Sequence, residues 1–429
     1  MTRTVEHHRV APQPDALDTT VVTSWKAPIA FAIFALIALA LAVFAPRPGE
    51  TTYRWSREND AVQVPDLVVP VMPALWVVVG LLIVATLYSV LLVRSKRRVP
   101  LWLIVVFAIL FMFAFLTWAG SGSSLPMIGL LFGSLSLAVP LIFGSLAGVI
   151  GERAGVINIA IEAQLLAGAF TAAVVASVTG QPWLGLIAAM VAGMLVGMVL
   201  AAFAIKYFVD QVIVGVVLNV LVVGLTSFFF SQVLAPNAAV LNTPPRFDRL
   251  PIPLLSEIPI IGPVLFQQTI VVYLMYIAVA LVYVGLFHTR WGLRVRAVGE
   301  HPQAADTVGI KVNPTRFWNV ALAGAIAGLG GTFYTIGSGI AFNKEMTAGA
   351  GFIALAAVIF GQWDPIKATL AALLFGFASN LQNTLSVIGS PVPSEFMLML
   401  PYLVTIFAVA GLVGKSRAPA ADGKPYIKS

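Results

Sequence analysis

The chain has 429 residues, of which 59% are apolar and only 10% are Asp, Glu, Lys or Arg. Soluble domains carry about 45–50% apolar and about 25% charged residues, so composition excludes a water-soluble protein and predicts a polytopic membrane protein. The chain contains no cysteine, which excludes disulfides, thiolate metal sites and iron–sulfur clusters. The net charge of +7 requires no nucleic-acid partner, because membrane proteins concentrate Lys and Arg in their cytoplasmic loops.

Runs without a formal charge mark the predicted spans, since about 20 apolar residues cross a bilayer core. In chain order they cover 27–45, 67–93, 99–120, 125–150, 163–205, 211–235, 258–287, 317–343, 346–363, 368–393 and 396–414. The run 163–205 is long enough for two helices, which a Thr-Gly-Gln-Pro turn at 179–182 separates. The predicted fold class is therefore all-α, with about twelve transmembrane segments. Residues 346–363 contain several glycines, and either a full span or a broken or re-entrant helix is expected there.

The Lys and Arg residues predict the orientation of these spans. With the N-terminus inside, 19 of the 25 basic residues fall on the internal side, which places both termini in the cytoplasm. The C-terminal tail changes sides if 346–363 does not cross. Residues 1–26 are expected to form a disordered cytoplasmic tail rather than a signal peptide, 27–120 three N-terminal transmembrane segments, and 415–429 a polar cytoplasmic tail.

No nucleophile with a base in reach emerges from the sequence, so the chain is expected not to be an enzyme, and no metal site is predicted. Gly414-Lys415-Ser416 resembles the end of a phosphate-binding loop, but that loop needs a glycine five positions before the Gly-Lys pair, where this chain has Val409. We interpret the tripeptide as a helix end with a basic flank. Any nucleotide hydrolysis is therefore expected on another polypeptide.

A cluster of polar residues follows the span 125–150. Asn158 and Glu162 are four residues apart, so on a helix they would share one face, with Gln164 pointing nearly the opposite way. Polar groups inside a membrane normally pair or serve function. Two interpretations stay open: the strip lines a substrate path, or Glu162 pairs with Arg153 or caps a broken helix.

Uncharged amides also occur within later predicted spans, and Asn380 and Asn383 share a helical face. Amides both donate and accept hydrogen bonds, which suits a sugar or a base better than an ion, although amides also join neighbouring helices. The candidate residues of a substrate pathway are Asn158, Glu162, Asn219, Asn380 and Asn383.

The predicted cytoplasmic loop 289–316 contains five basic and two acidic residues. Pro302 suits the first position of a short helix, with Glu300 near its positive end, and Gly309 would end that helix. A short helix in an internal loop needs a surface to rest on, and a soluble partner is the natural one. The alternative is a solvated loop that only follows the positive-inside rule.

Four sequence blocks resemble a known family. The first is Gly151-Glu-Arg-Ala-Gly-Val-Ile-Asn-Ile-Ala-Ile-Glu162, and the second runs from Asp210-Gln-Val-Ile to Leu218-Asn219. The third lies between Gly292 and Ile310, and the fourth is Gly351-Phe-Ile-Ala-Leu-Ala-Ala-Val-Ile-Phe-Gly361 followed by Asp364-Pro365. In this order they resemble the inner-membrane permeases of ATP-binding-cassette importers for branched-chain amino acids, ribose and nucleosides, and most closely the nucleoside/simple-sugar branch.

The resemblance implies a permease core over 125–414 that forms half of a translocation pathway for a nucleoside or related simple sugar in a prokaryotic plasma membrane. It also implies three partners: an ATP-binding-cassette ATPase, a second permease in a heterodimer, and an extracellular substrate-binding lipoprotein. ATP would be hydrolysed by the ATPase, and this chain would bind no cofactor. The residues implied for the ATPase coupling loop are Arg294, Arg296, Gly299, Glu300, Pro302, Ala304, Ala305, Asp306 and Gly309.

Two features depart from that family. The three N-terminal segments exceed its usual core, and Ala163-Gln164 stands where related sequences tend to have a Gly-Met-like pair. An alternative function is an ion-coupled secondary transporter of a similar small polar solute. Such a transporter needs a titratable residue at mid-membrane, for which Glu162 is the candidate.

Overall fold

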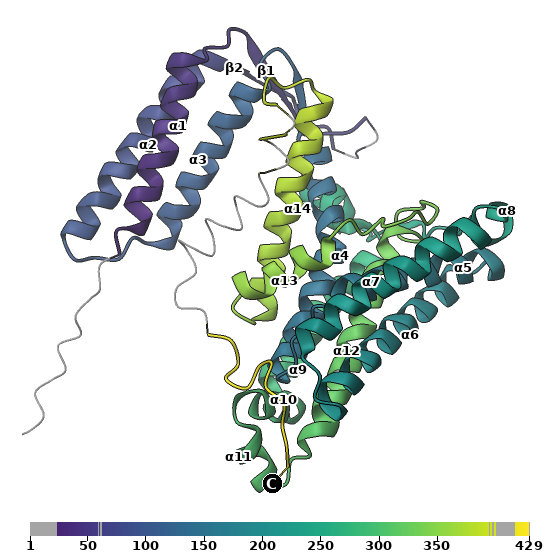
Figure 1. The fold of residues 1–429 in the computed structure, drawn as a ribbon. Helices are drawn as coiled ribbons and strands as arrows, with labels where there is room; N and C mark the ends of the chain where they lie inside the picture. The colour runs from purple at the N-terminus through teal and green to yellow at the C-terminus, as the bar shows by residue number, and fades with distance from the viewer. Residues whose placement is uncertain are drawn as a thin grey trace, which may run out of the picture. The chain divides into compact units, whose positions relative to one another are not determined.

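The computed structural model describes residues 24–58, 60, 62–393, 395–396, 399 and 417–428. Eight helical segments in this part of the chain are long and apolar enough to cross a membrane (Figure 1). They are α1 (Lys26–Phe44), α2 (Val71–Arg94), α3 (Leu101–Ala119), α4 (Met127–Arg153), α5 (Ile161–Thr179), α6 (Pro182–Ala201) with the π-helical turn 202–206, α7 (Gln211–Phe229) with the π-helical turn 230–234, and α9 (Ile270–His288). The predicted polytopic helical membrane protein is confirmed.

Two further helices have spanning length but more polar side chains. α12 (Val312–Gly331) has 20 residues and α14 (Pro365–Val387) has 23, which at about 1.5 Å per residue matches a bilayer core of about 30 Å. α12 begins five residues before the predicted run 317–343, and a 3₁₀ turn at 332–334 follows its end. The span expected at 396–414 and the tail expected at 1–26 lie almost entirely outside the described residues.

Residues 346–363 form a half-length helix. α13 (Ala350–Phe360) has 11 residues, which rise only about 16 Å, about half of a bilayer core. Gly349 at its start has φ +82°, and Gln362 and Trp363 after its end have φ near +55°. Of the two structures expected here, the chain adopts the broken helix, because left-handed residues stop it at both ends.

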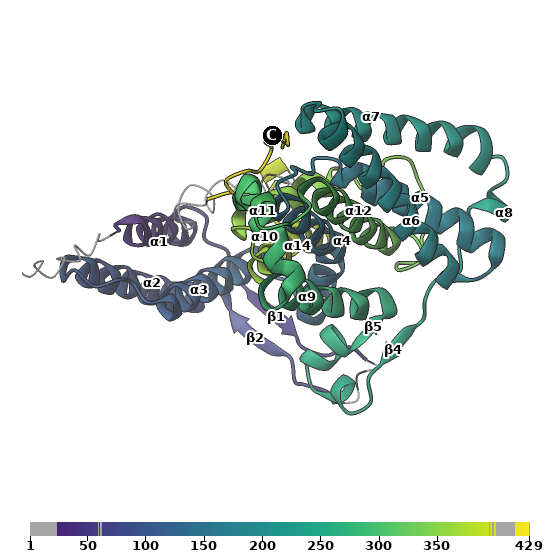
Figure 2. The same cartoon turned by 90° about the horizontal axis from the view of Figure 1, so that it is seen from below.

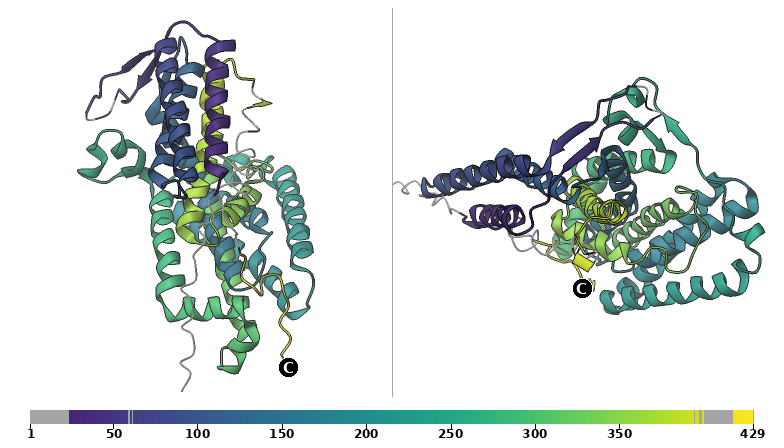
Figure 3. Two further views of the ribbon diagram at one scale, coloured as in Figure 1. Left: turned by 90° about the vertical axis from the view of Figure 1, so that its left-hand side faces the viewer. Right: turned by 90° about the horizontal axis from the view of Figure 1, so that it is seen from above.

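The chain divides into two compact units. The first, residues 1–47 and 72–118, contains α1–α3, which run side by side (Figure 3). In it the rings of Phe31 and Phe107 stack with centroids 3.9 Å apart, and the Trp118 indole donates to the Ala45 carbonyl. The second unit contains residues 48–71 and 119–429. The domain boundaries drawn from the sequence stay a prediction.

The exceptions to an all-helical fold are two small sheets in connecting segments of the second unit. β1 (Glu50–Arg54) pairs with the antiparallel β2 (Leu67–Pro70) and the parallel β3 (Ser124–Pro126). β4 (Arg249–Pro251) pairs antiparallel with β5 (Gln267–Thr269). Between α7 and β4 lies a short helix, α8 (Ala238–Leu241), and 3₁₀ and π-helical turns at 255–257 and 262–266 connect β4 to β5.

Small residues bring the helices of the second unit close together. α5, α6 and α7 lie to one side of α4 and α12 (Figure 2). A Cβ atom added at Gly328 of α12 would collide with the Ala189 carbonyl oxygen of α6, and one at Gly324 with the Gly193 carbonyl oxygen. Glycine therefore allows direct backbone contact between α6 and α12, as in other membrane bundles.

The last elements lie at one end of the second unit. α10 (Arg290–Glu300) and α11 (Pro302–Thr307) follow α9, and the C-terminal segment, defined here as residues 417–428, lies beside them (Figure 1).

Candidate functional site

The polar cluster after α4 surrounds a break in the helical path. α4 ends at Arg153 and α5 begins at Ile161, and the seven residues between them, called the break segment (154–160), are not helical. Gly155 has φ +87°, and a Cβ there would lie 2.7 Å from a guanidinium nitrogen of Arg316. Only glycine combines this φ with so close a neighbour.

Asn158 and Gln164 pair with each other across this break. The Asn158 amide donates to Gln164 Oε1 at 3.0 Å, and the Gln164 amide donates to Asn158 Oδ1 at 3.2 Å. Both side chains are fully buried. The expectation that Asn158 and Glu162 share a helical face, with Gln164 opposite, is wrong because Asn158 precedes α5.

Glu162 caps the half-helix α13. Its Oε1 accepts from the Thr347 hydroxyl at 2.6 Å and the Gly349 amide at 2.9 Å, and its Oε2 accepts from the Gly351 amide at 2.6 Å. The N-cap of α13 is Gly349, which has no side chain to offer, so a carboxylate from α5 satisfies the free amides and complements the helix dipole. A Glu162–Arg153 pair, considered from the sequence, does not form, because Arg153 faces Glu300 instead.

Asn219 of α7 caps the start of α5. Its Oδ1 accepts from the Ala163 amide at 2.9 Å, and its Nδ2 donates to the Ile159 carbonyl at 3.0 Å. Gln211, at the start of α7, accepts from the Ile157 amide at 2.7 Å. Side chains from α7 thus fix the break segment and the start of α5, and α5 in turn fixes the start of α13.

The end of α4, the break segment and the starts of α5 and α13 are called the junction. The two candidate amides of α14 lie apart from it. Asn380 donates to the Leu130 carbonyl at 2.7 Å, near the first turn of α4, whereas the junction lies at the last turn of α4. Asn383 is exposed, and no described residue hydrogen-bonds its side chain. The structure therefore brings Asn158, Glu162 and Asn219 together and leaves Asn380 and Asn383 elsewhere.

The predicted coupling loop folds into α10 and α11. α11 begins at Pro302 as expected, and Gly309 (φ +85°) follows its end, but α10 was not predicted. Within the predicted set, Gly299, Pro302 and Ala305 are buried, Arg296 and Asp306 are half-buried, and Arg294, Glu300, Ala304 and Gly309 are exposed. The apolar side chains of Leu293 and Val308 are also exposed, by 61% and 75%.

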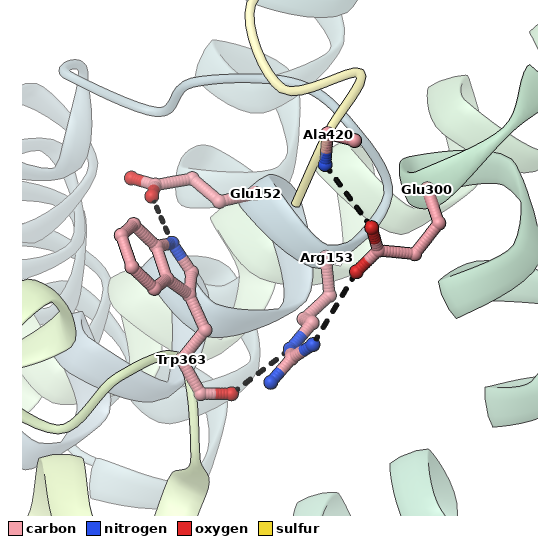
Figure 4. A network of polar contacts seen from close by, with 5 residues as sticks. All are labelled: Glu152, Arg153, Glu300, Trp363 and Ala420. Atoms are coloured by element: carbon pink, nitrogen blue, oxygen red, sulfur yellow. Dashed lines mark hydrogen bonds and ion pairs between the residues drawn. The ribbon is translucent and has the colours of Figure 1, made fainter. Parts of the chain in front are cut away.

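The end of α10 rests directly on the end of α4 (Figure 4). A Cβ at Gly299 would collide with the Arg153 carbonyl oxygen. The Arg153 guanidinium lies 4.0 Å from Glu300 Oε1 and donates to the Trp363 carbonyl at 3.0 Å, and the Trp363 indole donates to Glu152. α10, the end of α4 and the turn between α13 and α14 therefore form one contact.

The C-terminal segment is fastened to the same surface, where the sequence predicted only a polar tail. The Ala421 amide donates to the Gly299 carbonyl at 2.9 Å, and the Ala420 amide donates to Glu300 at 3.2 Å. Arg316, only 1% exposed, donates to the Lys424 carbonyl at 2.7 Å. Tyr426 packs with Val298, Ala305 and Val312. The available sequence signal was the Pro-Tyr-Ile tripeptide at 425–427 in an otherwise polar stretch.

Asp422 is the charged group that this segment buries. Burial raises the pKa of Asp422 to about 7, against the opposing effects of the Gly423 amide and of Arg316. In the part of the chain that the structure describes, no three His, Asp or Glu side chains gather as metal ligands.

Comparison with known proteins finds a family of membrane permeases and several related permeases. Residues 130–409 match the family described as branched-chain amino acid transport system / permease component. A guanosine ABC transporter permease protein of Bacillus subtilis (strain 168) is 43% identical over 310 residues, which cover 69% of this chain and 95% of that protein. A nucleoside ABC transporter permease protein of Lactococcus lactis subsp. cremoris (strain MG1363) is 40% identical over 308 residues, with the same two coverages.

A second protein of Bacillus subtilis (strain 168), also described as a guanosine ABC transporter permease, is 26% identical over 294 residues, covering 66% of this chain and 83% of that protein. No solved structure matches the chain. The matched family range leaves out α1–α3 and the C-terminal segment.

Proposed function

Because this chain belongs to the family of branched-chain amino acid transport system permease components, we propose that it is the permease subunit of an ATP-driven importer of nucleosides or related simple sugars. Relatives at 40–43% identity that are named for guanosine and nucleosides support this substrate class. The observation that carries the coupling mechanism is the contact of α10 with the end of α4, immediately before the break segment.

In this proposal an ATP-binding-cassette ATPase docks on α10 and α11. Exposed Leu293 and Val308 offer apolar contacts that a helix facing only water would not favour. Arg294, Arg296, Ala304, Asp306 and Gly309 contact the ATPase, and Gly299, Glu300, Pro302 and Ala305 seat the helices. ATP is hydrolysed by that partner, and this chain itself binds no cofactor.

A movement of α10 would be transmitted to the membrane interior through the end of α4, the break segment and α5. At Gly299 the two backbones touch, so a displacement of α10 moves the end of α4 without first rotating a side chain. The break segment follows Arg153 directly, and through Ala163 and Glu162 it leads to the start of α13. In this scheme Asn158, Glu162 and Asn219 position the junction, whereas Asn380 and Asn383 line the substrate pathway.

Three further features complete the proposal. The chain pairs with a second permease. Two different Bacillus subtilis permeases that are both named for guanosine support this pairing. An extracellular lipoprotein delivers the substrate. Both termini are cytoplasmic in a multi-pass protein of the prokaryotic plasma membrane. The position of the C-terminal segment beside α10 supports this orientation, since the predicted coupling loop must face the ATPase.

The test compares two substitutions of equal chemistry. Val308→Asp places a charge immediately after α11, and Val387→Asp places one at the opposite end of the second unit, where the side chain is 86% exposed. We expect Val308→Asp to reduce both copurification of the ATPase and ATP-dependent nucleoside uptake at least about tenfold, with normal membrane abundance. Val387→Asp should leave copurification unchanged. Wild-type uptake by the Val308→Asp variant would refute docking at α11, and ion-driven uptake without ATP would favour the secondary transporter.

A further inference from the structure

A cavity of about 630 Å³ opens at the end of the second unit that lies opposite α10. Phe132 and Ser136 from the first three turns of α4 line it, together with residues 246–249, β5 and the segment after α12. Its volume lies within the range of about 300–1,000 Å³ that is typical of small-molecule sites. None of its lining residues belongs to the junction or to the coupling surface, which is formed by α10 and α11.

Rigid aromatic rings form the apolar part of this cavity. Phe132, Phe247 and Phe333 line it. Phe247 is buried, its amide donates to the Ile336 carbonyl at 2.9 Å, and its ring packs edge-on against Trp183 with centroids 4.9 Å apart. An aromatic wall of this kind favours a flat ligand.

The polar part of the cavity is rich in hydrogen-bond donors. Arg246 and Arg249 line it, and neither makes an ion pair with any described residue. The guanidinium of Arg249 lies 4.7 Å from the ring centroid of Phe132, and that of Arg57 lies 4.8 Å from the same centroid. The hydroxyl of Thr269 is buried without a partner among the described residues. The two arginines are exposed, but a buried hydroxyl without a partner is costly unless a ligand or water meets it.

The cavity also contains one carboxylate. Asp248 lies between Arg246 and Arg249 in the chain and lines the cavity with them. Arginine pairs with the O6 and N7 acceptors of guanine, and a carboxylate accepts from the N1–H group that guanine and hypoxanthine share. Adenine instead has a donor at position 6 and an acceptor at N1, which would face Arg and Asp with the wrong groups.

We propose that this cavity is the permease's own nucleoside site and that it selects 6-oxopurine nucleosides such as inosine and guanosine over adenosine. The proposal rests on the proposed function and deepens it. The base stacks on the half-buried Phe333 ring, Arg246 and Arg249 donate to O6 and N7, and Asp248 accepts from N1–H. With the second unit oriented as above, the site faces outward and receives the substrate before the coupling surface moves.

The experiment measures binding of radiolabelled inosine and adenosine by equilibrium dialysis to the full chain in nanodiscs, without partner subunits. We expect inosine to bind at least about fivefold more tightly than adenosine, since one good bidentate pair discriminates by about that factor or more. Arg249→Gln should weaken inosine selectively. Asp248→Asn, which can donate to N1 of adenine, should shift the preference toward adenosine. Arg290→Gln, at the opposite end of the same unit, is the matched control.

The outcomes separate two failures. A variant that merely unfolds would lose both nucleosides equally, so the change in the inosine-to-adenosine ratio is the decisive readout. Equal binding of both nucleosides, or a ratio that Arg249→Gln and Asp248→Asn leave unchanged, overturns this inference even if the complete transporter imports nucleosides in cells. If the complete transporter imports none, the proposed function itself fails, and this inference fails with it.

Discussion

The α6–α12 interface and the junction of α4, α5 and α13 are both buried in the second unit, but different groups hold them together. At the first, glycines let two backbones touch, and no polar side chain is needed. At the second, Gly351 of α13 also touches the Glu162 backbone, but Glu162 and Asn219 in addition supply hydrogen bonds that the helix ends cannot make for themselves. The α6–α12 interface therefore depends on the absence of side chains, whereas the junction depends on both close packing and specific polar side chains.

The largest expected effect comes from separating α6 from α12. Gly328→Val places methyl groups where the Ala189 carbonyl oxygen lies, so α6 and α12 must move apart, at a cost of about 3 kcal/mol or more. We expect little folded protein by fluorescence-detected size exclusion. Gly224→Val is the matched control, because a Cβ at Gly224 meets nothing within 4 Å. Equal abundance of the two variants would contradict the backbone-contact interpretation.

A smaller effect is expected at the start of α13. Glu162→Gln replaces one carboxylate oxygen with an amide that cannot accept, which leaves a buried donor unpaired at a cost of about 1–3 kcal/mol. The protein should still fold, with a lower melting temperature and reduced uptake. Glu345→Gln makes the same chemical change at an exposed carboxylate before α13 and should match wild type. Full uptake and an unchanged melting temperature for Glu162→Gln would remove the capping role.

Removing the cap of α5 tests the same junction more gently. Asn219→Ala deletes the acceptor for the Ala163 amide, and loss of a cap costs about 1 kcal/mol. Asn383→Ala is the comparison, since that side chain is exposed and its loss should not lower the melting temperature. Reduced uptake by a stable Asn383→Ala variant would support its place in the substrate pathway, and wild-type uptake would argue against it.

The smallest effect is a pH dependence of the C-terminal segment. Burial raises the pKa of Asp422 to about 7, above an unfolded value of about 4, so the docked segment binds its proton more tightly than the free one. Docking is therefore most stable below pH 4 and weakens as the pH rises toward 7. Glu152 and Arg316 are the charged groups beside Asp422.

A spin label at residue 427 would report this change as greater mobility at pH 8 than at pH 5.5. Asp422→Asn should reduce the pH dependence while keeping the segment docked. Equal mobility of the wild type at both pH values would contradict the assigned burial of the Asp422 carboxyl.

The sequence predicted the elements that depend on local composition. Uncharged runs located the spans because a lipid-facing helix must be apolar over its whole length, and Pro302 with Gly309 located α11. The junction was not predictable in the same way. Glu162 caps a helix whose N-cap, Gly349, lies 187 residues later, and Asn158 meets Gln164 only because Asn158 lies in the non-helical break segment before α5. Helical periodicity describes neighbours on one helix and carries no information on which distant helix end lacks a cap.

The C-terminal segment has a consequence for the biogenesis of the protein. Arg316 finds its acceptor at Lys424, 108 residues further along the chain, and Gly299 meets Ala421 over a comparable interval. Until the ribosome has made residues 421–424, the Arg316 guanidinium and the Gly299 carbonyl lack these partners. The surface of α10 that these residues cover is therefore completed only after nearly the whole membrane core has been synthesised.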